Sequence, residues 1–502
     1  MPSAAFRQKI SPAPESTRIQ SSPAAPFGTY NLDNRTSLRE AIPFGLQHVL
    51  AMFTANIMPI VIVFTTIGLF GSEFAIHSML GAIFMAGLGT IIQLFIGARL
   101  PVITGTSFTF LPVLLTIGTS ENCLGNPEVA YYTIMGSIIF GSLFAVAFSL
   151  LYRFWGKLIK PIVPAIVVLG VGLSLLASGA NWFLGGDGII KNIITTGETG
   201  TGVPYFCYII VAFVTLITAL LWSIFMTGIW KNLNIVVAIA LGYIVSCCIP
   251  GMVNFDSMVA TEIIGPHGII DFPHLINLTK VRFELVPCIL VSVCFIATIV
   301  EAIGNTVTVA KSGLEREATL RDINGGLICY GINGAIGALF GAFPVTIYAQ
   351  NVGIVAQNKV VNRFSFFIGA LFLLTASFFP PVAHFIYSIP DAVIGGTMII
   401  LLGTIAVVGM KSISEVGWTD KNILITAISV CLGFGITVAN ISLGTNDVAL
   451  SVNIFRSLGL GWLSDLLVNN VLNMFIISFI LSWVLPDSMH LSFFHRKRKK
   501  EG

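Results

Sequence analysis

The sequence predicts an all-α polytopic membrane protein. Of its 502 residues, 55% are hydrophobic and only 10% are charged, whereas soluble domains carry about 25% charged residues. The mean hydropathy is +0.91. Many segments of roughly 18–25 residues carry little or no charge, and this length crosses a hydrocarbon core of about 30 Å. The 49 Gly and 22 Pro residues indicate close helix packing and interrupted spans.

The pattern of apolar segments predicts 14 transmembrane spans. They lie near residues 42–68, 76–97, 101–119, 130–151, 161–179, 204–226, 232–250, 286–310, 325–342, 344–361, 364–387, 390–410, 421–440 and 466–485. With both termini in the cytoplasm, all but four of the 26 Lys and Arg residues fall on the inner side, as the positive-inside rule requires. The exceptions are Lys191, Lys280, Arg282 and Arg456. Omitting one span would move every later loop to the wrong side, so the charges also support the count.

The spans divide seven and seven around a polar connection. We expect a disordered cytoplasmic N-terminal tail at 1–40, a first repeat at 41–250, an extracytoplasmic connection at 251–285, a second repeat at 286–487 and a basic cytoplasmic tail at 488–502. The N-terminal tail is polar and rich in Pro and Ser, so we predict no cleavable signal peptide. The eight Cys residues show no metal-ligand spacing and are expected to be small apolar side chains.

Two segments resemble broken helices more than full spans. They are LPVITGTSFTFLP at 100–112 and FPVTIYAQNVG at 343–353, in the third span of each half. Extended backbone at membrane depth is tolerated only where it lines a cavity or is buried in protein. Matching interruptions in two halves predict a binding site between inverted repeats. The alternative is that Pro and Gly merely kink two packed helices.

Glu301 is a carboxylate deep inside the apolar segment 287–310. An acid at that depth costs about 2.5–3.5 kcal/mol on insertion scales unless it is paired, hydrated or protonated. Asn305 lies one helical turn later on the same face. Glu301 is therefore predicted to hold a polar solute or to carry a proton. The alternative is a structural acid that hydrogen-bonds a neighbouring helix.

Further polar and aromatic candidates lie near the broken spans and in the first span. Gln350 and Asn351 are predicted at a helix start, where backbone N–H groups are free. A side-chain amide offers a donor and an acceptor side by side, which suits the edge of a heterocyclic base, although both amides could instead satisfy broken backbone. His48, beside Gln47, is a candidate proton relay, ligand contact or interhelical hydrogen bond. Phe108 could stack on a flat ligand or simply pack.

At these residues the chain resembles the nucleobase–ascorbate transporter family, the xanthine/uracil permease type of nucleobase:cation symporter, over nearly all of residues 40–490. The family signature reads Gln350-Asn351-Val352-Gly353 and ends at Asn358-Lys359, with Asn358 where the family has Thr. The family's Gln-His pair of the first span is Gln47-His48, and its acid of span eight is Glu301. Its Gly-x-Ser-Phe segment is Gly105-Thr106-Ser107-Phe108.

The resemblance implies a fold of two inverted seven-span repeats, with short extended stretches in spans 3 and 10. Spans 1–4 and 8–11 would form a core domain, and spans 5–7 and 12–14 a gate domain. It also implies a homodimer in the plasma (inner) membrane, surrounded by lipid. Proton coupling would involve Glu301 and His48. The residues expected to bind substrate are Glu301, Gln350, Phe108, Asn305, Ala55, Asn351, Gly353 and Ser107.

Gln350 and Asn305 resemble the purine carriers of the family, because uracil carriers often have Glu and His at these places. Several members carry an acid in span nine that helps proton coupling, and Tyr330 occupies that position here. We therefore predict a transporter that imports a purine (urate, xanthine, guanine or hypoxanthine) by H⁺ symport with alternating access. Na⁺ is left open as the coupling ion. No cofactor, enzymatic activity or nucleic-acid partner is expected.

Three alternatives remain open at this stage. One is a carrier of uracil or another pyrimidine. Another is an anion carrier or channel of the same fold, which would need a cation at the half-helix ends; neither broken segment contains Lys or Arg. The third, a membrane scaffold that transports nothing, gives no reason for a buried Glu beside a broken, amide-bearing span.

Overall fold

A computed structural model of the chain describes residues 32–33, 36–120, 122–123, 125–156, 158–227, 230, 233–253, 270–435 and 470–486. Most of the predicted N-terminal tail and all of the C-terminal tail lie outside the described residues. So do 254–269 of the connection, 436–440 of predicted span 13 and 466–469 of predicted span 14.

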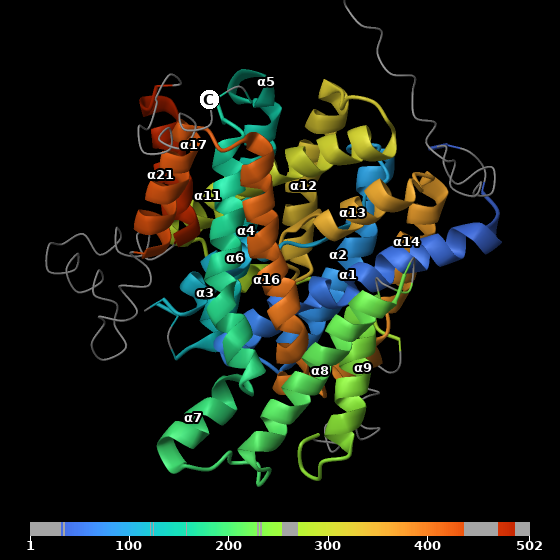
Figure 1. Cartoon of the computed structure of the whole chain (residues 1–502), viewed down its shortest axis with the longest axis vertical. Coiled ribbons are helices and arrows are strands. Elements are labelled where there is room, and N and C mark those ends of the chain that lie inside the picture. The colour runs from blue at the N-terminus through green and yellow to red at the C-terminus, as the bar shows by residue number, and fades with distance from the viewer. Residues whose placement is uncertain are drawn as a thin grey trace, which may run out of the picture.

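The described part is helical, with one short sheet (Figure 1). The first half contains α1 (Leu38–Thr66), α2 (Glu73–Phe95), β1 (Thr104–Thr106), η1 (Phe108–Phe110), α3 (Leu111–Gly118), α4 (Pro127–Leu150), α5 (Tyr152–Trp155), α6 (Ile162–Phe183), α7 (Gly186–Thr196), α8 (Tyr205–Phe225) and α9 (Asn234–Cys247). The second half contains η4 (Leu278–Lys280), α11 (Leu285–Thr308), η5 (Val309–Gly313), α12 (Leu320–Leu339), β2 (Val345–Ile347), α13 (Ala349–Asn358), α14 (Arg363–Ala376), α15 (Pro380–Tyr387), α16 (Asp391–Val416), α17 (Asp420–Ile428), η6 (Ser429–Phe434) and α21 (Asn470–Val484).

This is an integral membrane protein. Among the described residues, 7 helices are long and apolar enough to cross a bilayer, or up to 8 if one bent pair counts as a single span. Shorter apolar helices occur at Phe108–Gly118, Asn234–Cys247 and Asn470–Val484. The first two belong to predicted spans 3 and 7, and the third belongs to predicted span 14.

The helix boundaries differ from the predicted spans in two places. Predicted span 11 is two helices, α14 and α15, bent by 84°. The bend falls before Pro380 and Pro381, where the missing N–H groups and the restricted preceding residue end a helix. The predicted loop after span 5 contains the amphipathic helix α7, bounded on both sides by glycines in left-handed conformation, Gly185 and Gly197.

The two broken segments meet, as their matched positions predict. β1 pairs with β2 in antiparallel register, with Thr104 opposite Ile347 and Thr106 opposite Val345. The pairing continues beyond the strands, because the Ser107 N–H donates to the Pro344 carbonyl at 2.9 Å. Each strand leads into a helical segment, η1 and α3 in the first half and α13 in the second. Backbone polar groups that would be unsatisfied in lipid thus satisfy one another.

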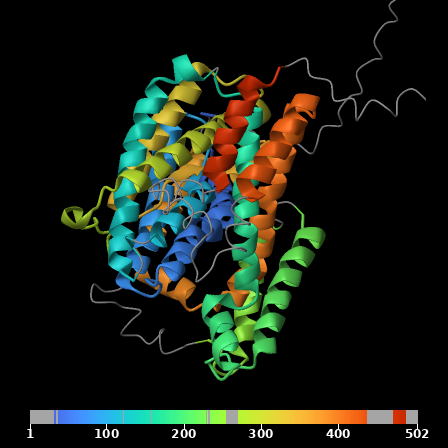
Figure 2. The ribbon, with the colours of Figure 1, turned by 90° about the vertical axis from the view of Figure 1, so that its left-hand side faces the viewer.

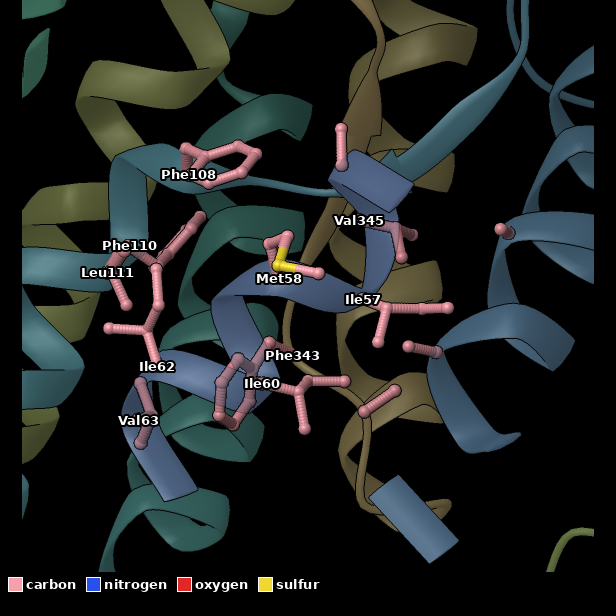
Figure 3. Packing of buried hydrophobic residues seen from close by; sticks show 14 of the residues in the cluster. Ile57, Met58, Ile60, Ile62, Val63, Phe108, Phe110, Leu111, Phe343 and Val345 are labelled. Atoms are coloured by element: carbon pink, nitrogen blue, oxygen red, sulfur yellow. The ribbon is translucent and has the colours of Figure 1, made fainter. Parts of the chain in front are cut away.

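Side chains of α1 pack against both broken segments. Figure 3 shows Met58 of α1 in one cluster with Phe108, Phe343 and Val345. Met58 is 2% exposed and Phe343 is fully buried. α1 therefore supports the strand pair from one side and excludes water from it.

The helices around the strand pair follow a repeated pattern of contacts. α1 and α2 of the first half both pack against α14, while α11 and α12 of the second half both pack against α4. A second group contains α6, α8, α9, α16 and α21, in which α6 and α16 lie side by side (Figures 1 and 2).

Glycines allow α6 and α16 to approach closely. A Cβ added at Gly409 would lie 2.4 Å from the backbone of Leu169, and one at Gly172 would lie 2.3 Å from the Ala406 nitrogen. Small residues at helix contacts let backbones pack tightly in membranes, where the hydrophobic effect does not drive helix association. A Cβ added at Gly403, also on α16, would have no neighbouring atom within 4 Å.

We predict that Gly409→Ala destabilises the contact between α6 and α16. The added methyl overlaps the Leu169 backbone, and overpacking of this kind costs about 1–3 kcal/mol. The thermal unfolding midpoint of the detergent-solubilised protein should fall. Gly403→Ala, on the same helix, should leave the midpoint unchanged or raise it slightly. Equal midpoints for the two variants would contradict the observed packing.

Candidate functional site

A cavity of about 230 Å³ lies where the strand pair meets α6 and α16. Three groups of residues line it: Thr106, Ser107, Phe108 and Thr109 after β1, Thr346, Ile347, Tyr348 and Ala349 around β2 and the start of α13, and residues of α6 and α16. Glu301 of α11 completes the lining. The cavity is somewhat smaller than typical drug-sized pockets, so it suits a small, compact solute.

The first polar wall is organised by a turn at Ser107. The Ser107 hydroxyl accepts the Thr109 N–H at 3.3 Å and thereby caps η1. This turn directs the Thr109 hydroxyl to Glu301, where it donates to Oε2 at 3.0 Å. One oxygen of the carboxylate is thus held by the protein, and the Glu301 side chain still borders the cavity. A carboxylate or carboxylic acid in this position can bind an N–H or C=O group of a solute.

The second wall contains β2 and the first residue of α13. The Tyr348 hydroxyl donates to the Thr106 carbonyl at 3.0 Å, which ties the two walls together. The buried Thr346 hydroxyl has no hydrogen-bond partner among the described residues. Ala349 lines the cavity at the start of α13, where the N–H groups of the first helical turn lack partners within the helix.

The third wall is predominantly apolar. It is formed by Val168 and Val171 of α6 and by Leu401, Thr404, Ile405 and Val408 of α16. The lining residues that the structure describes include no Lys, Arg or His. The site therefore combines hydrogen-bonding groups on one side with an aliphatic surface on the other. Among the described lining residues, Glu301 is the one carboxylic acid.

Of the residues predicted to bind substrate, Glu301, Phe108 and Ser107 line this cavity. Asn305 does not, because its amide donates to the Ile347 carbonyl at 2.9 Å and so holds β2 in place. Gln350 lies in the first turn of α13, beside the cavity-lining Ala349. Its side chain is outside what the structure describes.

The remaining predicted residues lie behind the cavity. The Asn351 amide donates to the His48 carbonyl at 3.2 Å and joins α13 to α1. The His48 ring is buried against Phe366, with ring centroids 4.4 Å apart, and its Nδ1 has no hydrogen-bond partner among the described residues. Ala55 is buried in α1 and Gly353 is exposed on α13. Neither is among the lining residues.

Sequence reasoning missed three residues that organise the site. They are Thr109, Tyr348 and Asn56, and the contacts of the first two are described above. The fully buried Asn56 accepts both the N–H and the hydroxyl of Thr106 through Oδ1, at 2.8 and 3.1 Å. Asn56 could have been recognised from the sequence, because it is an amide inside an apolar stretch of the first span. Thr109 and Tyr348 stand beside residues that the sequence did single out.

Tyr330 occupies the position where some relatives of the predicted family carry an acid. It is buried in α12, and its hydroxyl donates to the Thr298 hydroxyl at 2.5 Å. Thr298 is three residues before Glu301 on α11. Tyr330 thus contacts the helix that carries Glu301 without itself lining the cavity.

Comparison with known proteins assigns the family. A model of the xanthine/uracil permeases, described as "Permease family", matches residues 39–442. The chain belongs to this family. It is similar to a Clostridium perfringens (strain 13 / Type A) protein provisionally named a purine permease, with 30% identity over 448 residues that cover 88% of this chain and 92% of the relative. It is also 28% identical to a xanthine permease of Bacillus subtilis (strain 168), with coverages of 88% and 95%.

Solved structures show that the permease shares its fold with more distant transporters. The transmembrane domain of the cyanobacterial bicarbonate transporter BicA matches with a TM-score of 0.55, covers 78% of this chain and 95% of its own, and is 17% identical. The murine anion transporter Slc26a9 matches with a TM-score of 0.57, coverages of 91% and 76%, and 13% identity. At these identities the likeness concerns the fold alone.

We predict that Asn56→Leu destabilises the site. The substitution keeps the branched shape and the number of side-chain heavy atoms but leaves the buried N–H and hydroxyl of Thr106 without their acceptor, which costs about 1–3 kcal/mol for each unsatisfied group. The thermal midpoint of the purified permease should fall by several degrees. Asn122→Leu removes a surface amide that donates to Glu284 and should have little effect. A midpoint unchanged by Asn56→Leu would show that the Thr106 contact contributes nothing to stability.

Proposed function

We propose that this permease imports a purine base, such as urate, xanthine, guanine or hypoxanthine, together with H⁺. The observation that carries the proposal is the cavity between the strand pair and α6–α16. A flat purine presents N–H and C=O groups along its edge and apolar faces above and below. Glu301, the Thr109 hydroxyl and the start of α13 suit the edge, while the aliphatic wall suits a face.

The named relatives support a purine over other solutes. The Bacillus subtilis relative is named a xanthine permease and the Clostridium perfringens relative a purine permease. In this proposal Glu301 accepts a hydrogen bond from an N–H of the base, and the Gln350 amide hydrogen-bonds to a neighbouring part of the edge. Phe108 contacts the base through its ring or its backbone. Asn305 and Asn351 act indirectly, because both amides hold backbone segments of the site.

No cation lies among the described lining residues, which argues against an anion carrier. BicA and Slc26a9 show that this fold also serves anions. An anion bound at the start of a helix gains from the helix dipole, but beside Glu301 it would meet a carboxylate, with no Lys, Arg or His in the described lining to compensate. Guanine and hypoxanthine, which are uncharged at neutral pH, avoid this repulsion, whereas urate is itself an anion and would meet it.

The contact pattern supports the proposal of 14 spans in two inverted repeats. The packing of α1 and α2 on α14 has its counterpart in the packing of α11 and α12 on α4, which follows if the second half repeats the first. The antiparallel pairing of β1 with β2 is the arrangement that a two-fold axis in the membrane plane would produce. Spans 1–4 and 8–11 then form the core domain, and spans 5–7 and 12–14 the gate domain.

The position of the cavity supports alternating access. Its polar walls come from elements of the proposed core domain and its apolar wall from α6 and α16 of the proposed gate domain. Movement of one group against the other would open the site to either side of the membrane. An aliphatic wall makes few directional contacts, so it can slide past a bound base.

Proton coupling is assigned in this proposal to Glu301. Tyr330 stands where some relatives have a second acid, and its hydroxyl donates to Thr298. Glu301 must therefore couple protonation to substrate binding without a second acid at that position. His48 is buried behind the site and acts as a supporting group. We further propose a homodimer in the plasma (inner) membrane with both termini in the cytoplasm, which agrees with the distribution of Lys and Arg.

The decisive test is uptake of labelled uracil, xanthine, urate, guanine, adenine and ascorbate by cells that lack their own carriers. We expect saturable uptake of at least one purine and its loss when a proton uncoupler is added. Glu301→Gln should reduce uptake at least tenfold, because the amide cannot exchange a proton. Glu284→Gln, at the partly exposed N-cap of the same helix, is the matched control and should transport normally.

Two outcomes would overturn parts of this proposal. If no base is taken up saturably while the protein is present at the cell surface, purine import is wrong. If Glu301→Gln transports at the normal rate and remains sensitive to the uncoupler, Glu301 is not the coupling group.

Gln350→Glu should shift preference toward pyrimidines if the amide reads the edge of the base. Uracil carriers of this family often have Glu at this place, and a carboxylate removes the N–H donor that the amide provides. The ratio of uracil to xanthine uptake in the same cells measures the shift. An unchanged ratio would show that Gln350 does not set specificity.

A further inference from the structure

Three potential metal ligands converge on one face of the protein, away from the cavity. The Nδ1 atoms of His77 and His274 are 3.5 Å apart, and His274 Nε2 is 3.6 Å from an Asp271 carboxylate oxygen. One ligand atom from each of the three residues lies within 4.8 Å of the other two. None of these residues lines the solute cavity.

The three side chains come from segments far apart in the sequence. His77 lies near the start of α2, whereas Asp271 and His274 belong to the connection between the two halves. This part of the connection is anchored by its backbone. The Asp271 N–H donates to the Phe378 carbonyl at 2.9 Å, and the Ile276 N–H donates to the Leu339 carbonyl at 2.8 Å. The His77 and Asp271 positions are therefore set by packed structure.

We propose that His77, Asp271 and His274 bind a Zn²⁺ ion that fastens the connection to α2. Imidazole nitrogen and carboxylate oxygen are typical zinc ligands, and three protein ligands plus water complete a tetrahedral site. Bond lengths of about 2.0–2.1 Å place neighbouring ligand atoms about 3.3 Å apart. The separation of the two histidine nitrogens, 3.5 Å, is already close to this value.

Small side-chain movements complete the site. The Asp271 side chain is 13% exposed, whereas that of His274 is 49% exposed. His274 faces His77 through Nδ1 and Asp271 through Nε2, so its ring must turn to present a single nitrogen to an ion that all three residues share. The ligand set also selects the metal. Mg²⁺ and Ca²⁺ prefer all-oxygen sites, whereas two imidazoles favour Zn²⁺ and its neighbours in the transition series.

Zinc binding would act on stability. An ion that binds only the folded protein raises its stability in proportion to the logarithm of ion concentration over Kd. It would cross-link α2 to a connection that already contacts the ends of α12 and α14 through Leu339 and Phe378. The outer ends of these helices would then unfold together.

The test uses the full-length permease in detergent, purified without a polyhistidine tag and treated with EDTA. At pH 7.5, where imidazole is neutral and able to bind metal, micromolar ZnCl₂ should raise the thermal midpoint by roughly 3 °C or more. MgCl₂ at the same concentration should have no effect. Titration should show one Zn²⁺ per chain.

Variants separate this site from adventitious zinc binding. His274→Ala, at an exposed position, should fold normally and lose the midpoint shift, with zinc affinity at least tenfold weaker; His77→Gln and Asp271→Asn should behave similarly. His384→Ala, on α15, should keep the full response. A shift of equal size in His274→Ala and in the unmodified protein, or no shift in the unmodified protein, would overturn the proposal.

Discussion

The pairing of β1 with β2 is the constraint on which the rest of the site depends. Extended backbone in the membrane must find partners within the protein, and each of these three-residue strands finds them in the other. Because the partners are 241 positions apart at Gly105 and Thr346, neither half can complete the site alone. The amides of Asn56 and Asn305 then hold the two strands from either side by bonding to Thr106 and Ile347.

This arrangement explains how an acid can stand at membrane depth. Glu301 receives a hydrogen bond from Thr109 on the opposite half and borders a cavity, so it has a polar partner within the protein. The facing wall is aliphatic and rests on close contacts between α6 and α16, where Gly172 and Gly409 let the backbones approach. The polar groups therefore lie on one side of the cavity and an aliphatic surface lies on the other.

Much of this was predictable from local sequence. Apolar segments of sufficient length identify membrane helices, and Pro with β-branched residues identified the two extended segments at 100–112 and 343–353. Glu301, Ser107 and Phe108 were recognised and do line the cavity. The bend between α14 and α15 was missed although Pro380 and Pro381 mark it, because hydropathy averaged over a span does not register a break in direction.

The sequence by itself determined the membrane class, the broken segments and the residue types at the site, because hydrophobicity, backbone restrictions and the cost of a buried charge are local properties. Tertiary structure alone decided which polar residues face the cavity and which hold it together. Asn305 and Asn351 resemble ligand contacts in the sequence, yet both bond to backbone carbonyls. Thr109 resembles an ordinary span residue, yet it contacts Glu301. Such roles depend on partners brought together only when the two halves pack.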